Sequence, residues 1–136
     1  KEIDTVKNNP QLNLVKSPSY DVSKFVKMAN NNPDYLDKFI KSTLEALYIY
    51  EQEFLEAVEA KSAEMIDNLI HKSTMSIFYI QANNLSELMQ NVSILMKNNT
   101  HDVQIQKKSN QCIAEFKEII NGLKELNAID VLEQLD

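Results

Sequence analysis

Several residue types are scarce or missing in this chain, and each shortage excludes a class of protein. The single cysteine, Cys112, rules out an internal disulfide and a cysteine-based metal site, a usage typical of a reducing compartment. The single glycine, Gly122, leaves no glycine-rich loop that could cradle the phosphates of a nucleotide. We therefore expect a cytoplasmic protein that has no ATP site of its own.

The charge balance narrows the choice of partners. Arginine is absent and the formal net charge is −6, which argues against nucleic acid, because phosphate backbones require clustered positive charge. No apolar run approaches the length of a membrane span, and no signal peptide is visible. We expect contact with neither nucleic acid nor a membrane.

The length of 136 residues suits one compact domain. Residues 1–19 carry two of the three prolines and few apolar positions, so we interpret them as a leader, with some docking through Leu12, Leu14 and Val15. The folded domain is then expected over residues 20–136. A start at Lys1 without methionine suggests a domain of a longer polypeptide.

Apolar residues recur at helical spacing along this domain. We predict a short helix over residues 22–30 and a long one over 34–60, which Asn32 caps and Pro33 opens. Further helices are expected over 62–80 with Ser62 as the cap, over 84–96, and from about 103 to between 122 and 127, with a short tail afterwards. The predicted fold is all-α: an antiparallel four-helix bundle with a short additional N-terminal helix.

One histidine stands apart from the apolar pattern. At about 100° per residue, the buried stripe of the 62–80 helix is defined by Ile66, Leu69, Ile70, Ser73, Ile77 and Ile80. His71 lies about 140° from this stripe, on the same side as Thr74, Met75 and Phe78. The imidazole is therefore predicted to face solvent, with an apolar patch that could dock a partner beside it.

Other chemistry finds little support in the sequence. His101 follows Thr100 at a helix start, where a polar residue needs no special explanation. No second ligand lies at metal-binding spacing around His71, so no metal site is predicted. Cys112 falls on a core face, and no activated serine is present. An ordinary surface histidine remains the simplest alternative for His71.

The order of these features resembles the histidine-containing phosphotransfer (HPt) domain of multistep two-component phosphorelays. The resemblance covers residues 20–123 and depends on three segments together with the helices that follow: Tyr20-Asp21-Val22-Ser23, the segment 32–40, and Leu69-Ile70-His71-Lys72. Many members have Lys, Gly and Gly at three, four and ten residues after the histidine. Thr74, Met75 and Gln81 occupy those positions here.

The resemblance implies a phosphorelay intermediate, a phosphoprotein of signal transduction rather than a classical enzyme. His71 would accept a phosphoryl group from a receiver-domain aspartate and pass it to another receiver. Lys72, Thr74 and Met75 would lie near the phosphoryl group, and Phe78 and Gln81 would contact the partner. The partners implied are response-regulator receiver domains, and a hybrid histidine kinase in the same polypeptide is compatible with this scheme. The domain would need no cofactor, since Mg²⁺ is expected on the receiver.

Two alternatives stay open at this point. The chain could be an HPt-like adaptor that binds receivers or other signalling domains without being phosphorylated. It could also be an unrelated helical interaction domain of a larger protein.

Overall fold

The computed structural model describes residues 17–135, and residues 1–16 and 136 lie outside the described part. The predicted docking residues of the leader fall in that undescribed segment. The described chain forms six helices, which are labelled α2 (Ser23–Ala29), α3 (Pro33–Glu59), α4 (Ala63–Ile80), α5 (Asn83–Lys97), α6 (Asp102–Lys124) and α7 (Ala128–Leu135).

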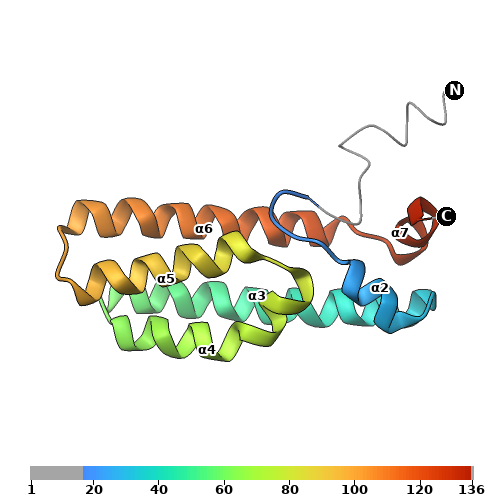
Figure 1. Ribbon diagram of the computed structural model, residues 1–136, viewed down its shortest axis with the longest axis horizontal. Helices are drawn as coiled ribbons and strands as arrows, with labels where there is room; N and C mark the ends of the chain where they lie inside the picture. Colours follow the sequence, from blue (N-terminus) through green and yellow to red (C-terminus); the bar gives the residue numbers. More distant parts are fainter. Residues whose placement is uncertain (1–16, 136) are drawn as a thin grey trace, which may run out of the picture.

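Four of these helices form an antiparallel bundle, as the sequence predicted (Figure 1). Helix α4 packs between α3 and α5, α5 packs on α6, and α6 returns to α3, so that the four helices enclose one core. The short helix α2 contacts α3 and α4, and it lies at the same end of the bundle as α7 (Figure 1).

The helix ends follow local signals in the sequence. Asn32 caps α3 as predicted, because its side-chain oxygen accepts hydrogen bonds from two backbone amides of the first turn. Ser62 caps α4 in the same way, through the backbone amide of Met65 at 3.1 Å. Asn30 and Asn99 adopt left-handed conformations after α2 and α5, a geometry that asparagine tolerates better than most residues.

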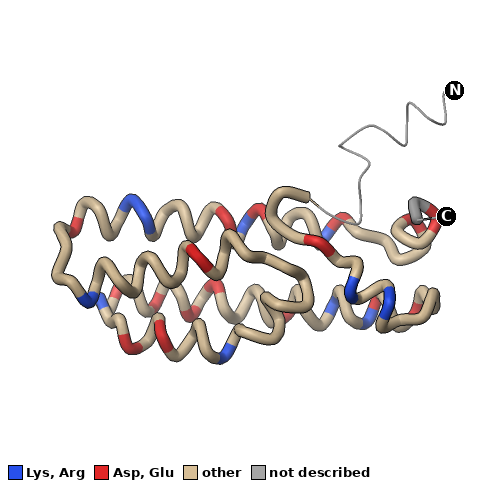
Figure 2. The backbone as a smooth tube through the Cα atoms, viewed as in Figure 1, with Lys and Arg blue, Asp and Glu red and all other residues tan. Residues whose placement is uncertain are grey.

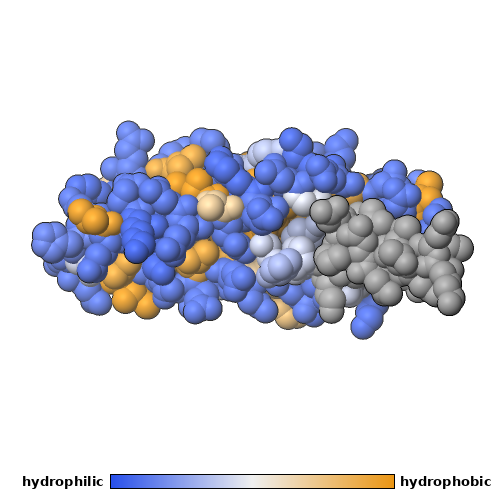
Figure 3. All heavy atoms as spheres, turned by 90° about the horizontal axis from the view of Figure 1, so that it is seen from above, coloured by the Kyte–Doolittle hydropathy of each residue, from blue (hydrophilic) through white to orange (hydrophobic). Residues whose placement is uncertain are grey.

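The core is apolar and closely packed. The rings of Phe54 in α3 and Phe116 in α6 have centroids 5.9 Å apart, and both side chains are fully buried. The expected core face of α4 is confirmed, although Ile70 is only half-buried. The outer face drawn in Figure 3 is mostly hydrophilic, with separate apolar patches among the hydrophilic residues. Burial of the apolar stripe of each helix therefore holds the bundle together.

The chain after α6 differs from the prediction. Where the sequence predicted a short tail, the chain forms the helix α7. Ala128 and Val131 of this helix are buried against the bundle. Asp37 of α3 accepts a hydrogen bond from the backbone amide of Ala128 at 3.1 Å and so satisfies one amide at the start of α7.

The N-terminal boundary of the domain also differs from the prediction. Ser19, which the prediction assigned to the leader, is buried. The folded unit therefore includes at least part of the segment before residue 20.

Candidate functional site

His71 lies near the middle of α4 and is exposed, as its distance from the apolar stripe predicted. The residues of the stripe on either side of it, Leu69 and Ser73, are buried and fix the rotation of the helix. The four ion pairs among the described residues are all formed by lysines, so the imidazole takes part in none of them. A rigid helix thus presents a nitrogen nucleophile to solvent.

Two large apolar side chains accompany His71 on this side of α4. Met75 follows it by one turn and is 56% exposed, and Phe78 follows it by two turns and is 55% exposed. Lys24 of α2 reaches over the ring of Phe78, with its ammonium nitrogen 4.8 Å from the ring centroid. We call His71, Met75, Phe78 and Lys24 the α4 face. It combines a nucleophile, an apolar patch and one cation.

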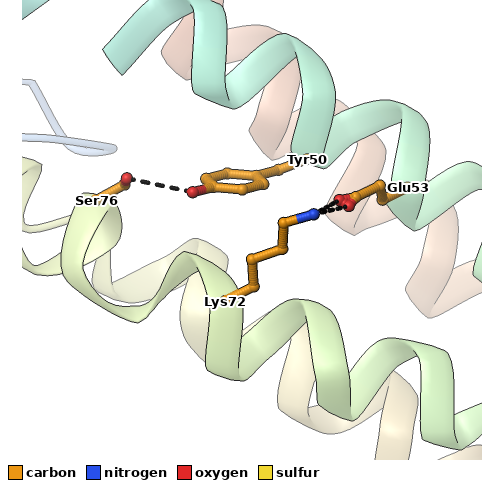
Figure 4. Close-up of polar contacts among 4 residues, drawn as sticks. All are labelled: Tyr50, Glu53, Lys72 and Ser76. Carbon is orange, nitrogen blue, oxygen red and sulfur yellow. Dashed lines mark hydrogen bonds and ion pairs between the residues drawn. The ribbon is translucent and has the colours of Figure 1, made fainter. Parts of the chain in front are cut away.

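Lys72 is engaged elsewhere. Its Nζ atom lies 2.6 Å and 2.8 Å from the two carboxylate oxygens of Glu53 in α3 (Figure 4). One turn further along, the hydroxyls of Tyr50 and Ser76 share a 3.5 Å hydrogen bond between the same two helices (Figure 4). The hydrogen bond with Glu53 raises the pKa of Lys72, so the ammonium group stays charged. Lys72 can serve as a cation for His71 only when this ion pair opens.

The remaining predicted site residues have local structural roles. The Thr74 hydroxyl donates a hydrogen bond to the carbonyl oxygen of Ile70 at 2.8 Å, so its oxygen retains capacity to accept. Gln81 lies one residue beyond α4, in a left-handed conformation with φ 51° that ends the helix. The predicted end of this helix at residue 80 is therefore confirmed, and Gln81 is its C-cap. Its backbone terminates the element that carries the site.

Charges of both signs surround the α2 end of the bundle. Figure 2 shows blue lysine segments on α2 and on the first half of α3 with red carboxylate segments among them, and further blue segments on the other long helices. The lysines at the α2 end are Lys24, Lys27, Lys38 and Lys41. Asp21, Asp34, Asp37 and Glu45 lie in the same stretch, so its four lysines are matched by four carboxylates and this end has no excess of positive charge. The lysine of the α4 face is therefore a single cation in a region of mixed charge.

One cavity of the bundle borders the α4 face, whereas the largest one described lies away from it. A hollow of about 260 Å³ between α4 and α5 is lined in part by Thr74, Phe78 and Gln90. The largest cavity described, about 630 Å³, is lined by residues of α3, α5 and α6 and by Lys61, and none of the predicted site residues reaches it. Within residues 17–135, no three His, Cys, Asp or Glu side chains are grouped as a metal site would require, and no helix is long and apolar enough to cross a membrane.

Sequence reasoning missed two residues near the site, Glu53 and Lys24. Each comes from another helix, and each contacts a predicted site residue across a helix interface. Both are charged residues on outer helix faces, where the apolar periodicity that locates buried positions carries no information. Only the packing of α2 and α3 against α4 brings them to the site.

No protein-family model matches this chain, and the comparisons with curated proteins and with solved structures find no significant match either.

Proposed function

We propose that this chain is a phosphorelay intermediate that accepts a phosphoryl group on His71 and passes it to a receiver domain. The observation that carries this proposal is the exposed position of His71, near the middle of α4 and beside two exposed apolar side chains, Met75 and Phe78. An imidazole used only for packing would not be held in solvent on a helix whose rotation is fixed by its buried stripe. The all-α bundle and its short leading helix agree with the architecture that the sequence resemblance implies.

The chemistry requires little from this chain. The unprotonated ring nitrogen of His71 would attack the phosphorus of an aspartyl phosphate on the partner. A nitrogen–phosphorus bond forms as the phosphorus–oxygen bond to the aspartate breaks, and the aspartate leaves as a carboxylate. The reverse reaction, with a second receiver, passes the group on. The partner's Mg²⁺ would neutralise the charge that develops on the phosphoryl oxygens.

The test is transfer of label from phosphorylated receiver domains to the purified chain, with His71→Gln as the control. We expect label on the native chain that is lost in acid, as a phosphoramidate requires, and none on the variant. Label that survives acid, or that appears equally on His71→Gln, would contradict the proposal.

One observation favours a second candidate, a receiver-binding adaptor that is not phosphorylated. Met75 occupies the surface one turn from His71, where an incoming phosphoryl group and its carrier would need space. The variants Met75→Gly and Met75→Ala distinguish the two functions, because they open this space to different degrees. In a relay protein, both variants should raise the rate of phosphoryl transfer. An adaptor should bind receivers without accepting label in either.

A further inference from the structure

The contact between Lys72 and Glu53 bears directly on the chemistry at His71. Lys72 is the residue next to His71 in sequence and projects about 100° away around α4. Glu53 holds its ammonium group through both carboxylate oxygens, at 2.6 Å and 2.8 Å, on the side of α4 that faces α3 (Figure 4). The flexible four-carbon stem of lysine could otherwise carry this charge to a phosphoryl group on the neighbouring residue.

This ion pair is one that a phosphoryl group could open. The Lys72 side chain is 58% exposed and that of Glu53 is 29% exposed, so water and salt weaken their attraction. A phosphoryl group carries nearly twice the charge of a carboxylate at neutral pH and has three strong acceptor oxygens. It is therefore the better partner for the ammonium group wherever the lysine can reach both.

We propose that Glu53 is a positioning residue for the reaction at His71: it holds Lys72 against α3 in the resting chain and competes with the phosphoryl group for that lysine. This inference rests on the proposed phosphorelay function. It assigns Glu53 an inhibitory role, since its carboxylate removes the cation nearest in sequence to His71 from the transition state. Loss of the carboxylate should therefore speed the loading of His71.

The expected size follows from the exposure of the pair. Exposed ion pairs shift equilibria by a factor of at most about five. Glu53→Gln should accordingly raise the initial rate of phosphoryl transfer to His71 about two- to fivefold. Lys72→Met should lower the rate, because the cation is then lost altogether.

A double-mutant cycle tests whether Glu53 acts through Lys72. Initial rates of label transfer from one phosphorylated receiver are measured for the native chain, Glu53→Gln, Lys72→Met and the double variant. Glu56→Gln is the matched control. Glu56 is exposed, lies one turn from Glu53 on α3 and, together with Glu53 and Lys72, lines a hollow of about 300 Å³ between α3 and α4, but it does not bond to Lys72. Thermal unfolding midpoints of all variants verify that the bundle is intact.

The inference predicts that Glu53→Gln accelerates loading in the native background, that the gain disappears in the Lys72→Met background, and that Glu56→Gln leaves the rate unchanged. An equal gain in both backgrounds, or an equal gain from Glu56→Gln, would mean that the loss of negative charge alone is responsible, and would overturn the role of Glu53. So would an unchanged rate for Glu53→Gln when the native chain is labelled. Absence of label from every variant would instead refute the phosphorelay function and this inference with it.

Discussion

The ring of Tyr20 lies directly against the backbone of Gly122, where a Cβ atom on residue 122 would come 2.6 Å from both Cε2 and Oη of the tyrosine. Tyr20 is buried in the segment that precedes α2, and Gly122 lies near the end of α6. The only glycine of the chain thus leaves room for an aromatic ring that anchors this segment to the last long helix.

Gly122→Ala should destabilise the protein by about 1–3 kcal/mol, because the ring or the helix must move to admit a methyl group. Helix propensity alone predicts the opposite sign, since alanine is favoured over glycine in a helix interior by about 1 kcal/mol. Denaturant unfolding measures the difference. Asn121→Ala, an exposed change on the same helix, is the matched control and should have little effect. A Gly122→Ala variant as stable as the native chain would refute this contact.

Loss of the Ser62 cap should weaken the helix that carries His71. Its hydroxyl accepts the hydrogen bond from the backbone amide of Met65, and without it this amide has only water as a partner. We expect Ser62→Ala to lower the free energy of unfolding by about 1 kcal/mol and Ser62→Asp to restore most of it. Ser42→Ala, on the exposed surface of α3, should be neutral. Equal losses for the two Ser62 variants would rule out capping as the cause.

Phe78 should contribute to partner binding more than to stability. Phe78 is 55% exposed, so truncation removes only a part-buried ring and its contact with Lys24. On the proposed function, Phe78→Ala should weaken receiver binding tenfold or more, as loss of a central aromatic contact does, while the free energy of unfolding falls by only about 1 kcal/mol. Titration by surface plasmon resonance gives the affinity. Val103→Ala, an exposed apolar change in α6, should leave binding intact.

Asp67 should make stability depend on acid. Hydrogen bonds from Lys97 and Ser93 lower the pKa of its carboxyl group in the folded state. A lowered pKa stabilises the fold above the ordinary carboxyl pKa, about 3.9, and this contribution disappears as the pH falls through the folded-state pKa.

The Asp67 side chain is 42% exposed, so screening keeps its contribution below about 1 kcal/mol. The native chain should therefore exceed Asp67→Asn in stability at pH 6, and the difference should shrink toward pH 2. Denaturant midpoints across this range measure it. A difference that is independent of pH would exclude the carboxylate as its source.

Cys112 should be unreactive until the bundle opens. Its side chain is fully buried in α6, and burial raises the pKa of the thiol well above its ordinary value. At pH 8 a thiol-specific reagent should therefore label the folded protein only at the rate of unfolding, and it should label the denatured protein at once. The time course of absorbance with a chromogenic disulfide reports both rates. Rapid labelling without denaturant would show that the residue is accessible.

Local patterns in the sequence were sufficient to predict the four long helices and most of their ends. Asn32 and Ser62 are caps with apolar periodicity immediately behind them, and such signals act within one turn of the chain. The exposure of His71 follows from the same periodicity, because five of the six predicted stripe positions are buried and fix the outward side of α4. The helix α7 was missed because its eight residues follow a break and have little room for a repeating pattern.

What the sequence by itself determined is the set of elements and the outward direction of His71, both of which depend on residues close together along the chain. Only the tertiary structure decided which residues from distant segments contact one another. It brought Glu53 into contact with Lys72, Lys24 with Phe78, and Tyr20 with Gly122. Each of these pairs joins segments that are separated in the sequence, so its geometry depends on how whole helices and the segment before α2 pack against one another. Hydrophobic burial sets that packing, and the surface contacts follow from it.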